Sequence, residues 1–202
     1  MTARPASGAP SPARSPTAPS DRRLLELAVA WMEGSHPYAP HLRRTLEWVR
    51  RLDPNARDAL CIAAVTHDAE RAFPAPRAPS VETWGTAAYE RWHQDRSARI
   101  VGEWLRANGA ADALVADVVA LVATHEDGGP DGADVLQAAD SLSFLEIQTG
   151  HFAAMVARGD LALDVALAKL RRTFDRITVP VARGLAEPML EPALARIRGS
   201  RP

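Results

Sequence analysis

The sequence predicts an all-α protein, and three observations support this fold class. Apolar residues recur at helical spacing from residue 21 onward, and strand-like alternation is nearly absent. Glycines and prolines separate these stretches, as is typical of helices joined by short loops. The chain has 202 residues, and 47% of them are apolar, which is enough for about one domain with a sizeable core. We therefore expect one helical domain over residues 21–198.

The first twenty residues have a different composition. After the initiating methionine, residues 1–20 are small residues, proline, serine, threonine and arginine. Such a segment cannot bury enough apolar surface to offset the entropy of ordering the chain. We therefore expect a disordered tail over residues 1–20.

Helix signals follow one another along the domain. Ser20 can cap a first helix over 21–33, and the Asp53-Pro54 pair stops a second helix over 38–52. A third helix is expected over about 55–68, and the prolines that follow it predict an ordered loop over 69–80. Further helices are expected over 86–107, 111–126, 131–148 and 160–177, with a last, broken helix over 181–198.

The charge of the chain is nearly balanced, with 24 basic residues, 25 acidic residues and a formal net charge of -1. This balance provides no basic field for sequence-independent nucleic-acid binding, so a small polar substrate is expected in place of a nucleic-acid polymer. The sequence has neither a membrane-spanning apolar run nor a secretory signal. A single cysteine, Cys61, excludes a disulfide framework. We expect a cytoplasmic protein without a membrane partner, and the oligomeric state is left open.

Six polar residues have the chemistry that a buried dinuclear metal site requires. They are His41, His67, Asp68, His93, His125 and Asp140. Imidazole nitrogen and carboxylate oxygen bind divalent ions such as Fe, Mn, Co, Zn or Mg, and such ions convert water into a nucleophile at neutral pH. The six residues lie on different predicted helices or helix ends, as a convergent ligand set requires. A metal-dependent hydrolase is therefore the leading interpretation.

Two of these residues illustrate why a cation is expected. His125 follows Val118, Leu121 and Val122 at spacings that place its ring on the buried stripe of its helix. Asp140 also lies on an apolar face, where a buried carboxylate requires a metal, a positive partner or several hydrogen bonds. A lone histidine on such a face is more often a core residue with a protein partner. A divalent cation, however, accounts for all six residues at once.

The order of a histidine, a His-Asp pair and a distant aspartate in a helical chain resembles the HD-domain superfamily of metal-dependent phosphohydrolases. The matching segments are HLRRTLEWV, AAVTHDAER, HQDRSARIVGEWL, ATHEDGG and LQAADSLSFLE. The additional His93 and His125 resemble the dinuclear branch of that superfamily. The resemblance implies an HD-type helical bundle with two divalent ions at its centre.

By position, the resemblance assigns one ion to His41, His67, Asp68 and Asp140. Asp68 would also bridge to a second ion held by His93 and His125. The implied activity is hydrolysis of a phosphomonoester or phosphodiester bond in a small, nucleotide-like substrate through a metal-activated hydroxide. Cyclic dinucleotides are not expected, because Glu126 follows His125 where the phosphodiesterases of that group have a second histidine.

Two other functions remain open on the same ligands. A diiron oxygenase would need iron that changes its oxidation state and an open position for dioxygen. A non-catalytic metal-binding module would hold its ion with a closed set of protein ligands. The ligand types alone do not separate these alternatives.

Several further residues are candidates for substrate binding and catalysis. Arg71 matches a position where many HD proteins carry a lysine near the substrate phosphate, although a solvated arginine is an equally good interpretation. Lys169, the single lysine, and Arg172 could complete a phosphate pocket, together with Arg176 on the same helical face. A charged surface stripe is the slightly favoured alternative for these three.

Acid-base and stacking candidates complete the set. Glu126 could protonate a leaving oxygen if its carboxyl group holds a proton, and Glu70 and Asp127 are weaker candidates for the same role. Trp84, in the proline-rich region, is the tryptophan placed to stack on a base. His36 and His151 match no ligand position and are assigned to structure or solvent.

Overall fold

The computed structural model describes residues 19–73, 75, 78–80 and 83–200, and within these ranges it contains helices and no strand. This confirms the predicted fold class. Most of the tail expected over 1–20 lies outside the described residues. No helix in the described ranges combines the length and apolarity needed to cross a membrane. The helices are α1 (Asp21–Ser35), α2 (Ala39–Leu52), α3 (Asp58–Thr66), η1 (Ala69–Ala72), α4 (Ala87–Ala107), α5 (Asp112–Val122), α6 (Ala133–Ser143), η3 (Phe144–Gln148), α7 (Thr149–Arg158), α8 (Leu163–Asp175) and α9 (Pro180–Arg198).

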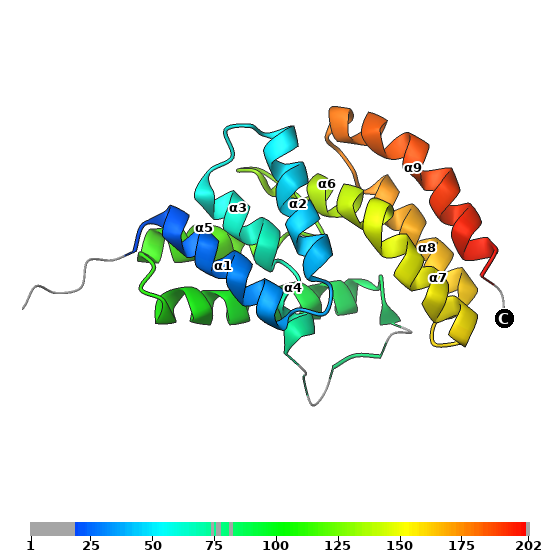
Figure 1. Cartoon of the computed structure of the whole chain (residues 1–202), viewed down its shortest axis with the longest axis horizontal. Coiled ribbons are helices and arrows are strands. Elements are labelled where there is room, and N and C mark those ends of the chain that lie inside the picture. Colours follow the sequence, from blue (N-terminus) through cyan, green and yellow to red (C-terminus); the bar gives the residue numbers. More distant parts are fainter. Residues whose placement is uncertain (1–18, 74, 76–77, 81–82, 201–202) are drawn as a thin grey trace, which may run out of the picture.

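Helices α2 and α6 form the centre of the bundle. They pack against each other, and α2 also contacts α1 and α3. Figure 1 shows α1, α3 and α5 at one end of the molecule and α7, α8 and α9 at the other, with α2 and α6 between them. The central pair therefore connects the two ends of the fold.

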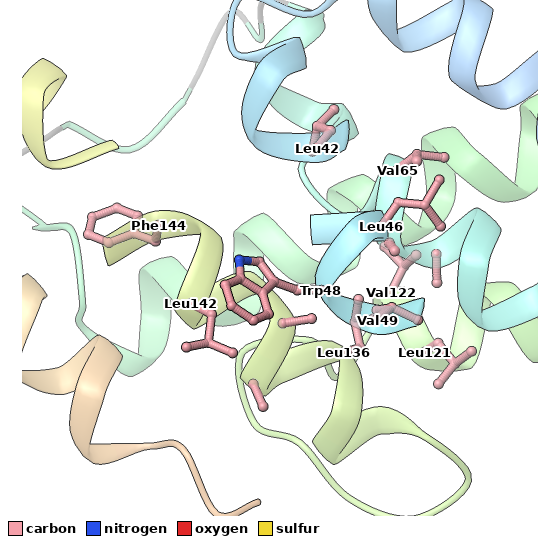
Figure 2. Close-up of a cluster of buried hydrophobic side chains, with 14 of the residues drawn as sticks. Leu42, Leu46, Trp48, Val49, Val65, Leu121, Val122, Leu136, Leu142 and Phe144 are labelled. Carbon is pink, nitrogen blue, oxygen red and sulfur yellow. The ribbon is translucent and has the colours of Figure 1, made fainter. Parts of the chain in front are cut away.

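A cluster of buried aliphatic side chains holds the central helices together (Figure 2). Leu42, Leu46 and Val49 project from one stripe of α2 at helical spacing, and each is buried. Val65 of α3 and Leu136 of α6 belong to the same cluster. Because this packing orients α2, α3 and α6 relative to one another, it also orients the polar residues that these helices carry.

The N-terminal half follows the predicted helices closely. The Ser20 side chain accepts a hydrogen bond from the Arg23 backbone N–H and caps α1 as expected. Helix α3 is shorter than predicted and ends at Thr66, so the His-Asp pair lies in the turn that follows. The stretch predicted as a loop over 69–80 begins with the short 3₁₀ helix η1, and its other described residues are not helical.

The largest departure from prediction lies after α6. The single helix expected over 131–148 is instead α6, which ends at Ser143, followed by the π-helical turn η3. Helix α7 then continues the chain to Arg158, where the sequence analysis predicted no helix. A π-helical turn holds more residues than an α-helical turn and so breaks the regular apolar spacing from which helices are predicted.

The last helix also differs from expectation, because α9 is continuous and not broken. Pro188 and Pro192 lie inside it, and both are exposed. The backbone hydrogen bonds that they remove are therefore on the solvent side, where water can serve the freed carbonyl groups. The buried face, which includes Ala186 and Leu194, keeps its packing.

Candidate metal centre

The six candidate ligands are buried and converge into two groups of three. One group consists of His41, His67 and Asp140, and the other of Asp68, His93 and His125. Within each group, one ligand atom from every residue lies within 4.8 Å of the others. The structure therefore brings together all the residues that the sequence analysis proposed as metal ligands.

Local sequence explains where the first of these ligands stand. Pro40 at the start of α2 suits the first helical turn, and His41 follows it on the buried side of the helix. Helix α3 is buried on all sides and ends at Thr66, whose hydroxyl donates back to the Ile62 carbonyl oxygen. The chain turns there and presents His67 to the interior.

Asp140 is the shared carboxylate of the first group. Its Oδ1 atom lies 3.1 Å from Nε2 of His41 and 3.3 Å from Nε2 of His67. Asp140 projects from α6, whereas the two histidines come from α2 and from the turn after α3. Three separate segments thus contribute to one small polar centre.

The second group is equally compact. Nε2 of His93 lies 2.9 Å from Oδ1 of Asp68 and 3.2 Å from Nε2 of His125. The His67 and His125 rings, one from each group, have centroids only 5.0 Å apart. The two groups therefore adjoin and form one dinuclear candidate centre.

The outer ring nitrogens determine which tautomer each histidine adopts. Nδ1 of His67 lies 3.0 Å from the Ala64 carbonyl oxygen, and Nδ1 of His125 lies 2.7 Å from the Val122 carbonyl oxygen. A carbonyl oxygen only accepts, so each Nδ1 carries the hydrogen and donates. In the neutral imidazole, Nε2 then presents a lone pair to the centre.

Side-chain acceptors impose the same tautomer on the other two histidines. Nδ1 of His93 lies 3.0 Å from Oε1 of the buried Glu70. Nδ1 of His41 lies 2.8 Å from the Ser143 hydroxyl, which donates its own hydrogen to the His41 carbonyl oxygen. Partners of this kind orient metal-binding imidazoles and raise their basicity.

The resulting arrangement fits a divalent ion in each group. Among the described residues, Nε2 of His67 has no hydrogen-bond partner, although the Asp140 carboxylate is close. The lone pairs of His93 and His125 point at each other and would repel unless a cation or a proton lies between them. Four imidazoles with two carboxylates favour transition-metal ions over Mg²⁺.

The electrostatics favour the metal-binding protonation state at Asp68 and His125 but not at His67, where burial lowers the pKa and the carboxylates of Asp68 and Asp140 raise it above its usual value. Burial raises the pKa of Asp68, but the Arg71 guanidinium and the neighbouring imidazoles of His67 and His93 lower it well below its usual range. Burial and the adjacent histidines lower the pKa of His125. A carboxylate and a neutral imidazole are the forms that bind a metal ion.

His36 has a structural role that agrees with its assignment from sequence. It is buried, and its Nε2 atom donates to the Asp68 carbonyl oxygen at 3.1 Å. Its Nδ1 atom accepts a hydrogen bond from the Tyr38 backbone N–H. The ring therefore ties the turn that carries Asp68 to the start of α2.

A cavity opens onto the candidate metal centre, with His41, Asp68 and Asp140 among its lining residues. The ligand groups are therefore not completely enclosed by the core.

Three basic side chains line the same cavity, namely Arg71, Lys169 and Arg176. The favoured interpretation of Lys169 and Arg176 as a surface stripe is wrong, since both side chains are 15% exposed and contact Glu126. Lys169 Nζ lies 3.4 Å from Glu126 Oε1, and Arg176 also binds Asp140. The packing of α8 against η3 brings these charges to the site.

Arg172 is not among the residues that line this cavity. Its guanidinium donates to the Trp84 carbonyl oxygen at 3.4 Å and lies against Gly85. Gly85 has a φ of +78°, and a Cβ atom there would overlap the guanidinium. Arg172 thus supports the cavity wall around Trp84 and does not face the metal centre.

Other cavity residues were not identified from the sequence. They include Tyr38, Tyr89, Phe144, Gln148, His151 and Phe152. Most belong to η3 and α7, the region in which helix prediction failed. The spacing of Phe144, Gln148 and Phe152 by four residues is the signal that could have placed them on one face.

Residues 28–194 match the model of a family described as a domain of unknown function, DUF4202. The match covers most of the chain and all six candidate ligands, so the chain belongs to this family. No curated protein and no solved structure matches the chain.

Proposed function

We propose that this member of the DUF4202 family is a metal-dependent phosphohydrolase that cleaves a phosphomonoester or phosphodiester bond in a small, nucleotide-like substrate. The observation that carries the proposal is the convergence of four imidazoles, each with its Nε2 lone pair directed inward, on the buried carboxylates of Asp68 and Asp140. Transition-metal cations satisfy such a centre. The basic side chains in the adjoining cavity complement a phosphate group.

The resemblance to the HD-domain superfamily supports the same proposal. The order of ligands along the chain, the helical fold and the presence of two adjoining groups all agree with the dinuclear branch. In this assignment Asp68 would help to hold both ions, and the structure groups it with His93 and His125. Its Oδ1 atom faces His93, and its Oδ2 atom lies 3.4 Å from Nε of Arg71.

The reaction transfers a phosphoryl group to water. For a monoester, R–O–PO₃²⁻ and H₂O give R–OH and HPO₄²⁻, so the P–O bond to the leaving group breaks and a P–O bond to the water oxygen forms. When bound, the divalent ions supply an acidified water and polarise the phosphoryl oxygens. The protein orients the ester so that the attacking and leaving oxygens are in line.

The chain's own residues bind and orient the phosphate. Arg71 and Lys169 line the cavity and carry charges that a phosphate requires, and Arg176 adds a third charge beside Asp140. Glu126 contacts both Lys169 and Arg176. Because Glu126 pairs with both cations, we assign it to positioning these side chains and not to the acid role suggested by sequence.

Elemental analysis and hydrolysis assays on one purified sample test the proposal. We expect about two transition-metal equivalents per chain, with release of phosphate or nucleoside from a panel of nucleotides and a generic phosphodiester. A chelator-treated sample serves as the control and should regain activity when metal is restored. Two bound irons without hydrolysis would favour the oxygenase, and no metal binding at all would contradict the metal centre.

A further inference from the structure

A group of aromatic side chains lines the cavity that opens onto the metal centre. The Phe152 ring centroid lies 5.7 Å from that of Trp84 and 5.0 Å from that of Phe144. The guanidinium of Arg71 lies over the Trp84 ring, 5.5 Å from its centroid. Neither metal binding nor phosphate binding requires this aromatic wall. Such a wall binds planar rings by stacking.

Gln148 is the uncharged amide within this aromatic wall. It is 7% exposed and lines the cavity, four residues after Phe144 and four residues before Phe152. The turn η3 ends at Gln148 and leads directly into α7. The turn η3 and the first residues of α7 therefore present an amide and two aromatic rings to the same space.

The carboxamide of Gln148 is available to a ligand. Within the described parts of the chain, this side chain makes no hydrogen bond. A carboxamide carries two donor hydrogens and an acceptor oxygen, and Gln148 can offer them to a molecule in the cavity that it lines. A bound molecule with a complementary donor and acceptor would pair with it.

We propose that Gln148 is a specificity-determining residue that pairs with the hydrogen-bonding edge of a heteroaromatic ring, and that the substrate is a nucleoside monophosphate. The inference rests on the proposed function, because the phosphate of this substrate must lie at the ions and basic side chains. A nucleobase offers both a flat face for stacking and adjacent donors and acceptors on its edge. A simple sugar phosphate offers neither.

The test compares two substrates that share a sugar and a phosphate. Metal-loaded protein is assayed with the four common ribonucleoside 5′-monophosphates and with ribose 5-phosphate, which lacks the ring. We expect the protein to prefer at least one nucleotide. Gln148→Met keeps the length of the side chain and removes the carboxamide. It should lower kcat/KM for that nucleotide about tenfold or more and leave ribose 5-phosphate hydrolysis unchanged.

Two further variants separate recognition from architecture. Gln148→Glu keeps the size and one acceptor but removes the donors, so it should also lose nucleotide preference while retaining its metal content. Ile147→Met alters an exposed neighbour in the same turn and should leave every kcat/KM unchanged. Equal losses on nucleotide and ribose 5-phosphate in both Gln148 variants would assign the residue to cavity structure and overturn the inference.

The outcome for the wild-type protein distinguishes the two proposals. Hydrolysis of nucleotides and ribose 5-phosphate at equal rates would overturn the inference and leave the phosphohydrolase intact. Absence of hydrolysis with every phosphoester would contradict the proposed function. In that case, nucleotide affinity measured by calorimetry still decides the inference. If the amide hydrogen-bonds to the ring, Gln148→Met should weaken that affinity about tenfold, and an unchanged affinity would overturn the inference.

Discussion

Replacing Asp68 by asparagine should empty the metal centre while changing the shape of the side chain very little. Asp68 lies 2.9 Å from Nε2 of His93 and belongs to the second ligand group. In the proposed assignment it also bridges to the first group, centred on Asp140. Asp68→Asn should therefore reduce the metal content from about two equivalents per chain to none.

The size of the effect on stability follows from linkage. An ion present at about 100 times its dissociation constant stabilises the folded state by about 2.7 kcal/mol. For a domain of roughly this length, 1 kcal/mol shifts the melting temperature by roughly 2–4 °C. Loss of one ion should thus lower Tm by roughly 5–11 °C, and loss of both ions by about twice as much.

Elemental analysis and thermal unfolding on the same samples provide the assay. The matched control is Asp117→Asn, which removes an exposed carboxylate that pairs with Arg57 outside both ligand groups. The control should retain both ions. Full occupancy in Asp68→Asn would refute the assignment of Asp68 as a ligand. Retention of one ion would refute the bridging role and restrict Asp68 to the second group.

Three further predictions concern the residues around the ligands. Glu70→Gln weakens the acceptor for the His93 Nδ1–H, so metal affinity should fall about 10- to 100-fold in a competitive titration, and unchanged affinity would contradict the orienting role. Burial lowers the pKa of Lys169, so its side chain loses its charge at a lower pH than an ordinary lysine does. The KM for the phosphate substrate should therefore rise at alkaline pH, and Lys169→Arg should move that rise to higher pH. An identical pH profile in the variant would exclude Lys169 from phosphate binding. Arg176→Met removes the arginine that pairs with Oδ2 of the buried Asp140, so urea unfolding of the metal-free protein should show a loss of about 3–5 kcal/mol, and an unchanged midpoint would argue against the pair.

The helical class and the candidate metal ligands were accessible from the sequence because both depend on local patterns. His125 follows three apolar residues at helical spacing, and its ring is buried as predicted, although the helix expected over 111–126 ends at Val122 and His125 lies in the turn that follows. The His67-Asp68 pair ends an apolar stretch in the same manner. Several buried imidazoles beside buried carboxylates are typical of a metal site, because a bound cation offsets the cost of burying these groups together.

The basic residues of α8 could not be placed in this way. Lys169 and Arg176 share a helical face, and a charged face is compatible with either solvent or a cavity. The packing of α8 against η3 decides between the two and buries both side chains beside Glu126. Long-range packing of this kind leaves no periodic signal within the helix itself.

By itself, the sequence determined that the chain forms helices and that the six candidate ligands face the interior, because side-chain chemistry and helical spacing are local properties. Only the tertiary structure decided that the ligands separate into two adjoining groups with their Nε2 lone pairs directed inward. It also placed Gln148 and the aromatic wall on the same cavity. These features depend on a π-helical turn and on contacts between segments that are distant in the chain, and the relative placement of such segments is set by packing and not by any one segment.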